Sequence, residues 1–196
     1  MSDQQHPWRQ PSDLETVLAR LKPVLVSLGI VEAGAGCTEA EIVAAEGRSR
    51  QFPEDVRAFY RSMRPTDLYA PGARREFGFY TIGSPELKWM PMDGAEPAED
   101  WVGAQGLFLG QSAFGDSFWW AEGHRTAPAG SIFLLDHEGN LSEDVMFGYF
   151  ARSFREFLAK LTYFKSLDSH EAASDALFRQ EYLELNPSVK RYTREN

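Results

Sequence analysis

Histidines next to carboxylates are the first residues of this sequence whose types could support chemistry. Residues 136–138 are Asp-His-Glu, and His124 lies two positions after Glu122. A metal ion needs several ligands that converge on one point, whereas neighbouring side chains of a strand point to opposite faces. Residues 136–140 also have the composition of a polar β-turn. We therefore interpret them as a turn, and we predict neither a metal site nor any other cofactor.

Ser112 is the next candidate, because residues 110–114, Gly-Gln-Ser-Ala-Phe, come within one residue of the Gly-x-Ser-x-Gly nucleophile motif. That motif joins a strand to a helix, but residues 118–120, Phe-Trp-Trp, predict a strand instead. The acids and tryptophans of this region also allow a carboxylate-based hydrolase or a sugar-binding protein, since separation in sequence says nothing about distance in space. We keep that alternative and predict that the protein is not an enzyme.

Charge is distributed very unevenly along the chain. Residues 84–144 contain eleven acidic and two basic residues, so this third of the chain carries a charge of −9, equal to the net charge of the whole protein. Such a region can attract a basic partner, or it can be a solvated face that keeps the protein soluble. The lack of clustered lysine and arginine argues against nucleic acid as a direct partner.

Trp119 and Trp120 stand in the middle of that acidic segment, in a run that predicts a strand. Because adjacent side chains of a strand face opposite sides, either both faces of the sheet are covered or one tryptophan lies near solvent. A tryptophan near solvent is a typical anchor for a protein partner. We predict a partner-binding surface made of the acidic and aromatic residues Asp116, Trp119, Trp120, Glu96, Glu99, Asp100 and Glu122.

The composition is typical of a soluble globular domain, with 196 residues of which 43% are hydrophobic and 25% are charged. Cys37 is the only cysteine, which excludes an intramolecular disulfide and a cysteine-rich metal site and favours a reducing compartment. Neither a signal peptide nor a run of about 20 apolar residues is visible. We expect a cytoplasmic protein that does not bind membranes.

The elements that must position these residues begin with helices. Residues 1–11 are expected to form a flexible tail, and a Ser-x-x-Glu capping box at residues 12–15 predicts the first helix. Pro23 should kink or split that helix, and Gly29 should end it. Further helix starts are predicted at Thr38, which opens a second capping box, and at Pro53.

A sheet is predicted in the middle of the chain and helices again at its end. Short aromatic and β-branched runs indicate strands near residues 77–82, 87–90, 107–109, 118–121 and 132–135. The connections are too short for helical crossovers, which favours antiparallel pairing. A third capping box at Ser153 starts an amphipathic helix, and a last helix is predicted over about 169–185. This order predicts a single α+β domain with a mostly antiparallel sheet of five to six strands.

Four segments, in this order, resemble the SUKH superfamily, which includes yeast cell-wall-assembly regulators and many bacterial immunity proteins. Residues 38–46 and 52–60 are similar to the family's acidic helix and the Leu-Pro-like step into its next helix. Residues 107–110 and 115–119 are similar to its central strand, glycine, turn and Gly-Asp strand. Residues 132–139 and the Ala-x-Ser-Phe-x-x-Phe-Leu pattern of residues 151–158 complete the resemblance. The chain departs from the family at residues 64–67, where Arg-Pro-Thr-Asp replaces the usual Asn-Gly.

The resemblance implies a SUKH-like α+β domain over residues 12–168, followed by a C-terminal helix and tail over residues 169–196, without catalytic machinery. Bacterial relatives are typically immunity proteins that neutralise a secreted toxin, often a basic nuclease or nucleic-acid deaminase. The oligomeric state does not follow from the resemblance. We therefore expect an immunity protein for a cognate basic toxin, with a general intracellular regulatory module of the same fold as the alternative.

Overall fold

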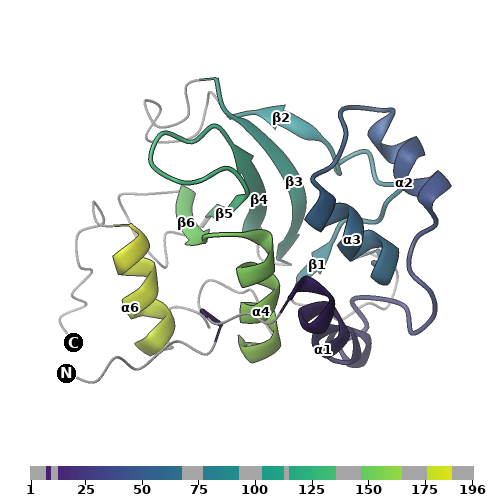
Figure 1. Cartoon of the computed structure of the whole chain (residues 1–196), viewed down its shortest axis with the longest axis horizontal. Coiled ribbons are helices and arrows are strands. Elements are labelled where there is room, and N and C mark those ends of the chain that lie inside the picture. Colours follow the sequence, from purple (N-terminus) through teal and green to yellow (C-terminus); the bar gives the residue numbers. More distant parts are fainter. Residues whose placement is uncertain are drawn as a thin grey trace.

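Three helices precede a six-stranded sheet and two helices follow it in the described part of the chain (Figure 1). The computed structural model describes residues 8–9, 13–67, 77–92, 103–112, 115–135, 147–164 and 176–186. The helices are α1 (Leu14–Ser27), α2 (Glu39–Glu46), α3 (Glu54–Ser62), α4 (Phe154–Phe164) and α6 (Ala176–Leu185). The strands are β1 (Phe77–Phe79), β2 (Trp89–Pro91), β3 (Gln105–Ser112), β4 (Ser117–Glu122), β5 (Ser131–Leu135) and β6 (Phe147–Ala151). The predicted α+β fold is confirmed.

The sheet is organised around β3, its longest strand. The strand order is β1-β3-β4-β5-β6, and β2 pairs with the first half of β3 while β1 pairs with its second half. All pairs are antiparallel, as the short connections predict. β3 runs three residues beyond its predicted end. Gly110 makes this possible, because an added Cβ there would lie 2.2 Å from the carbonyl oxygen of Gly78 on β1.

The helix starts follow the predicted capping, with a shift of one residue at two of them. The Thr38 hydroxyl accepts a hydrogen bond from the Glu41 N–H, and the Glu41 carboxylate accepts one from the Thr38 N–H, which confirms the capping box. The N-cap of α1 is Asp13, one residue after the predicted position, and Pro53 caps α3 from just outside the helix. The short side chain of an aspartate caps as well as that of a serine, so local sequence leaves the choice open.

Pro23 does not split α1, which continues as one helix of 14 residues. Leu21 and Leu25, on either side of the proline, are both fully buried. Packing on both sides therefore outweighs the one backbone hydrogen bond that proline removes. Among the helices in the described ranges, none has the length and apolar character that crossing a membrane requires.

The main hydrophobic core lies between the helices and one face of the sheet. Phe59 of α3, Phe79 of β1, Phe118 of β4 and Phe157 of α4 are each almost completely buried. Their ring centroids lie 4.5 Å apart for Phe59 and Phe79, 6.1 Å for Phe79 and Phe118, and 5.4 Å for Phe118 and Phe157. Burying each such ring stabilises the fold by about 1.5–3 kcal/mol, which fixes α3 and α4 against the sheet.

β6 was not predicted from the sequence, and α6 is docked on it. Gly148 interrupts the apolar alternation that would have marked the strand, because the ring of Tyr182 on α6 occupies the space of its absent side chain. At the end of α6, the Asn186 side chain accepts a hydrogen bond from the Tyr149 N–H at 2.7 Å and donates one to the Tyr149 carbonyl at 2.9 Å. The C-terminal helix is therefore an integral part of the domain.

Trp8 and Arg9 are packed against α6, although they belong to the segment predicted to be a flexible tail. The Trp8 ring is 2% exposed and its Nε1–H donates to Glu181 Oε2 at 2.5 Å. Arg9 Nε lies 2.9 Å from Glu181 Oε1. A single tryptophan among polar residues carries no periodic signal, so only the tertiary structure reveals this contact.

Lys160 of α4 and Glu181 of α6 form a buried ion pair next to Trp8. Lys160 Nζ lies 2.8 Å from Glu181 Oε2, and each side chain is 1% exposed. Burial lowers the pKa of Lys160, opposed by the charges of Glu181 and Glu156. Burial alone would raise the pKa of Glu181, but the Lys160 charge and several hydrogen bonds lower it to about 2. Glu181 is therefore ionised at neutral pH.

Candidate functional site

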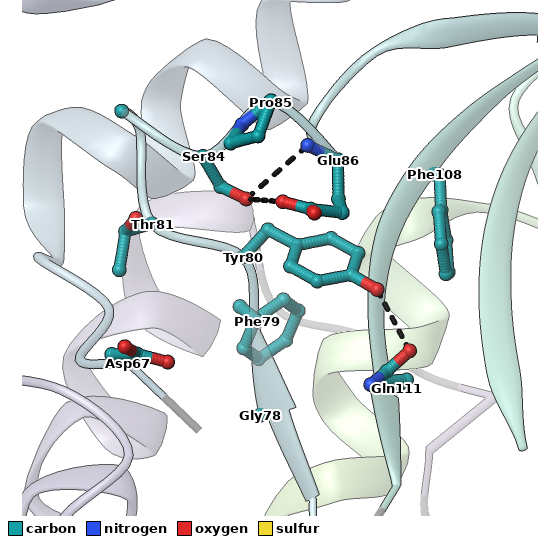
Figure 2. Close-up of a pocket in the computed structure, with 11 residues that line it drawn as sticks. Asp67, Gly78, Phe79, Tyr80, Thr81, Ser84, Pro85, Glu86, Phe108 and Gln111 are labelled. Carbon is teal, nitrogen blue, oxygen red and sulfur yellow. Dashed lines mark hydrogen bonds between the residues drawn. The ribbon is translucent and has the colours of Figure 1, made fainter. Parts of the chain in front are cut away.

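An open pocket lies where β1 ends, between the turn that follows it and strand β3 (Figure 2). Its volume is about 630 Å³, and its walls include Asp67, Tyr80, Glu86, Phe108 and Gln111. None of the described residues that line it is a lysine, an arginine or a histidine. The volume is in the range of about 300–1,000 Å³ that is typical of ligand sites.

Tyr80 is held firmly at the centre of the pocket. Its N–H donates to the Leu109 carbonyl at 2.9 Å, and its carbonyl accepts from the Tyr60 hydroxyl at 2.8 Å. Its own hydroxyl donates to Gln111 Oε1 at 2.8 Å, and its ring meets Phe108 edge to face at 4.7 Å between centroids (Figure 2). The two rings therefore form a pre-organised aromatic wall.

Two carboxylates face the same pocket, from Glu86 and Asp67. The Ser84 hydroxyl donates to the Glu86 carboxylate, and the Glu86 N–H donates to Ser84 Oγ at 3.3 Å. The Ser84 hydrogen bond lowers the pKa of Glu86, with a smaller contribution of the same sign from Lys88, whereas the charge of Asp67 opposes the shift. The pocket is thus acidic, and its two like charges interact with each other.

A row of aromatic rings crosses the sheet from this pocket. After Tyr80 and Phe108 come Trp119 of β4, Phe133 of β5 and Tyr149 of β6, which pair across the strands in register. Phe108 and Trp119 stack at 4.3 Å with planes 3° apart, and Phe133 and Tyr149 stack at 5.3 Å and 18°. We call these five residues the aromatic row. Cross-strand aromatic pairs stabilise a sheet and also form a flat contact surface.

The aromatic row occupies the face of the sheet away from the helices. Its members other than Tyr80 belong to a second apolar cluster, to which Met92 and Ala127 also contribute and to which no described helix contributes a residue, whereas Tyr80 packs against the main core. Trp119 and Phe133 in the middle are buried, whereas Tyr80, Phe108 and Tyr149 at the two ends are half-buried. The row therefore offers aromatic surface to solvent at its ends.

The structure places the predicted site residues in three different environments. Trp119 lies in the aromatic row, with its indole N–H donating to Ser117 Oγ at 2.8 Å. Asp116 is 1% exposed, so its side chain lies inside the molecule, and its backbone N–H donates to Ser112 Oγ at 3.1 Å. Trp120 points to the opposite face, into the main core. The prediction did not foresee that Asp116 would be buried.

Trp120 and Glu122 do lie in one neighbourhood, with Trp89 of β2 and Arg50. Trp89 meets Trp120 edge to face at 5.5 Å between ring centroids. The guanidinium of Arg50 lies 4.7 Å from the centroid of the Trp89 ring and pairs with both carboxylate oxygens of Glu122, at 2.5 and 3.1 Å. The charge of Glu122 is therefore already balanced within the chain.

The remaining predicted residues, Glu96, Glu99 and Asp100, lie outside the described residues. Eight of the eleven acids of the acidic segment fall in residues 93–102 and 136–146, which the structure does not describe. The strands that flank these ranges show where they leave the sheet. Residues 93–102 join β2 to β3 at the end of the strands where Gln105 lies. Residues 136–146 join β5 to β6 at the opposite end of the strands. Acidic segments thus start from both ends of the strands that carry the aromatic row.

Catalytic and metal chemistry find little support in the described ranges. No group of three or more potential metal ligands occurs there, and residues 136–138 fall outside them. His124 uses its Nδ1 to accept hydrogen bonds from the N–H groups of Thr126 and Ala127, which shapes the β4–β5 turn. Ser112 is fully buried in strand β3 and precedes a strand, not a helix.

Sequence reasoning missed Tyr80, Phe108, Glu86 and Asp67, the residues that make the pocket. The alternation of residues 77–80 placed Tyr80 on the face opposite Phe79, which is the one signal that pointed to it. Nothing local indicates that Asp67 and Glu86 line one pocket, because they lie in segments on either side of β1.

We compared the chain with protein-family models, with curated proteins and with solved structures, and found no significant match. The function is therefore argued from the geometry of the site itself.

Proposed function

We propose that this protein is a non-catalytic protein-binding domain, and specifically an immunity protein that neutralises a basic bacterial toxin through an acidic, aromatic surface. The observation that carries the proposal is the aromatic row on the face away from the helices, with half-buried rings at both ends. Aromatic side chains with part of their surface free are the typical anchors of protein interfaces.

The charge distribution supports a basic partner. Acidic segments start from both ends of the strands that carry the aromatic row, and the pocket at one end of the row is lined by Asp67 and Glu86, with no lysine, arginine or histidine among its described lining residues. A positively charged partner would be drawn to this face, and partners of like charge would be repelled. The sequence resemblance to the SUKH superfamily points to the same class of protein.

The pocket is less suited to hydrolysis. A carboxyl that acts as general acid in a glycosidase needs a raised pKa. The pKa of Glu86 is instead lowered by Ser84, and both Glu86 and Asp67 are exposed. We therefore propose that the carboxylates of the pocket bind a partner and do not catalyse a reaction.

A capture experiment with three forms of the protein tests the binding function. The wild type, the double variant Tyr80→Ser/Phe108→Ser and the control Val43→Ser would each be used as bait in extracts of the source cells, at low and high salt. Val43 is a matched control because it is 54% exposed on α2, among the helices. We expect one basic protein that the wild type and the control retain at low salt and that the double variant loses. An acidic partner, or equal capture by all three forms, would contradict the proposal.

The captured protein then separates an immunity protein from a regulatory module. It would be expressed alone in a bacterial host and again together with this chain. Growth arrest that co-expression relieves is the result expected of a toxin and its immunity protein. A partner that is harmless when expressed alone would favour the regulatory alternative.

A further inference from the structure

The pocket at Tyr80 combines the features that bind one particular side chain. Figure 2 shows the Tyr80 ring between the Glu86 carboxylate and Gln111, with Phe108 beside it. A guanidinium group is planar and carries its charge over the whole plane, so it stacks on aromatic rings and donates paired hydrogen bonds to a carboxylate. The Tyr80 ring with the Glu86 carboxylate beside it matches both properties.

The pocket is fixed before any ligand arrives. Hydrogen bonds hold Tyr80 at its N–H, its carbonyl and its hydroxyl. The turn that carries Ser84 and Glu86 is held from outside by Arg48, whose guanidinium donates to the Ile82 carbonyl at 2.8 Å. A pre-organised site loses little conformational entropy on binding, which leaves more of the contact energy for affinity.

The same chain already contains a guanidinium bound in this manner. Arg50 lies 4.7 Å from the centroid of the Trp89 ring and makes a two-pronged ion pair with Glu122. The pocket at Tyr80 repeats the combination of aromatic ring and carboxylate, but no described lysine or arginine lines it.

We propose that this pocket is the receptor for one arginine side chain of the protein partner, with the guanidinium against the Tyr80 ring and paired with Glu86. The inference rests on the proposed function, because it identifies the chemistry by which the same surface recognises a basic partner. Lysine fits less well, since its compact ammonium group neither stacks nor forms a two-pronged pair.

A titration with capped amino acids tests the pocket without the partner. N-acetyl-arginine-N-methylamide would be added to the isotope-labelled full chain at low salt, and backbone amide and Gln111 side-chain signals would be followed by NMR. The citrulline analogue has nearly the same shape without the charge, and the lysine analogue has the charge without the plane. We expect millimolar binding of the arginine compound, with shifts centred on Thr81, Gly83, Ser84, Glu86 and Gln111, and binding at least about fivefold weaker for each of the other two.

Variants localise the effect and keep the test independent of folding. Glu86→Gln removes the pairing charge with little change of shape and should weaken arginine binding at least about fivefold. Glu15→Gln, an exposed acid on α1, should leave it unchanged. Free arginine should bind less well than the capped form, because its own carboxylate would face the acids of the pocket. If free arginine binds better, the ligand is a small molecule and not a protein side chain.

Three results would overturn the inference: no shifts at 20 mM probe, equal shifts with the citrulline analogue, or shifts that Glu86→Gln leaves unchanged. These failures are separable from failure of the proposed function. Loss of a captured partner in the Tyr80→Ser/Phe108→Ser variant, together with no arginine binding, would keep the binding surface and remove only the arginine receptor. Arginine binding without any captured basic partner would do the reverse.

Discussion

The indole N–H of Trp8 donates a hydrogen bond to the buried carboxylate of Glu181, 173 positions further along the chain. The contact joins the N-terminal segment to the C-terminal helix. Lys160 of α4 pairs with the same carboxylate, with its Nζ 2.8 Å from Glu181 Oε2. Trp8, α4 and α6 are therefore parts of one structural unit, which makes the stability of the domain depend on residues near both ends of the chain.

We predict that Trp8→Ala lowers the free energy of unfolding by about 3–5 kcal/mol, because it leaves a cavity and takes a donor from a buried carboxylate. Trp8→Phe keeps most of the packing and should cost about 1–3 kcal/mol. Urea denaturation followed by circular dichroism measures both. Arg20→Ala on the exposed side of α1 is the control, expected within about 0.5 kcal/mol of wild type. A Trp8→Ala variant as stable as the control would show that the contact is dispensable.

The two members of the buried ion pair should differ in their sensitivity to substitution. Glu181→Gln leaves Lys160 buried with Glu156, at 3.6 Å, as its one charged partner among the described residues, and should cost about 3–5 kcal/mol. Lys160→Met leaves Glu181 with Arg9 and Arg152, at 2.9 and 3.1 Å, and should cost less. Chemical denaturation of both variants gives the order. The opposite order would mean that the contacts of Lys160 with its neighbouring rings outweigh its charge.

The stability of the domain should fall in acid. The pKa of Glu181 is about 2 in the folded state against 4.5 ordinarily, so its contribution is complete above pH 4.5 and is lost as the pH falls toward 2. Glu41, whose pKa is also lowered to about 2 by Arg64 and Thr38, acts in the same direction. Denaturation curves between pH 6 and pH 2.5 should show the advantage of wild type over Glu181→Gln shrinking as the pH drops. A constant difference over this range would contradict the lowered pKa.

Gly148→Ala should destabilise the protein by at least about 1–3 kcal/mol, because the added methyl group would lie 1.9 Å from the hydroxyl of Tyr182. Tyr182→Leu alone should also cost stability, since the ring is buried. The double variant should be less destabilised than the two single effects together, because the smaller side chain makes room for the methyl group. Thermal unfolding of all four forms completes this cycle. Additive effects would show that α6 relieves the clash by moving.

Local sequence was sufficient for the elements whose signals are local. The capping box at Thr38, the end of α1 near Gly29 and the order of helices and strands all depend on residues within a few positions of one another. The fold class followed from them. β6 was not predicted because it contains Gly148, a residue that the packing of α6 requires and that gives no local strand signal. The cap of α1 lies one residue later than predicted because Ser12 and Asp13 are equally good capping residues in isolation.

The composition of the site was decided by the tertiary structure. The sequence alone established that the acidity is confined to one third of the chain and that Trp119 and Trp120 must face opposite sides of a strand. Which of the two joins the aromatic row depends on the side of the sheet that the helices cover, and that is a property of the whole fold. Asp67, Tyr80 and Glu86 line one pocket, and Arg50 pairs with Glu122, because the fold brings together residues that no local interaction connects. Local physics determined the elements of this protein, and their long-range packing determined which side chains form a surface.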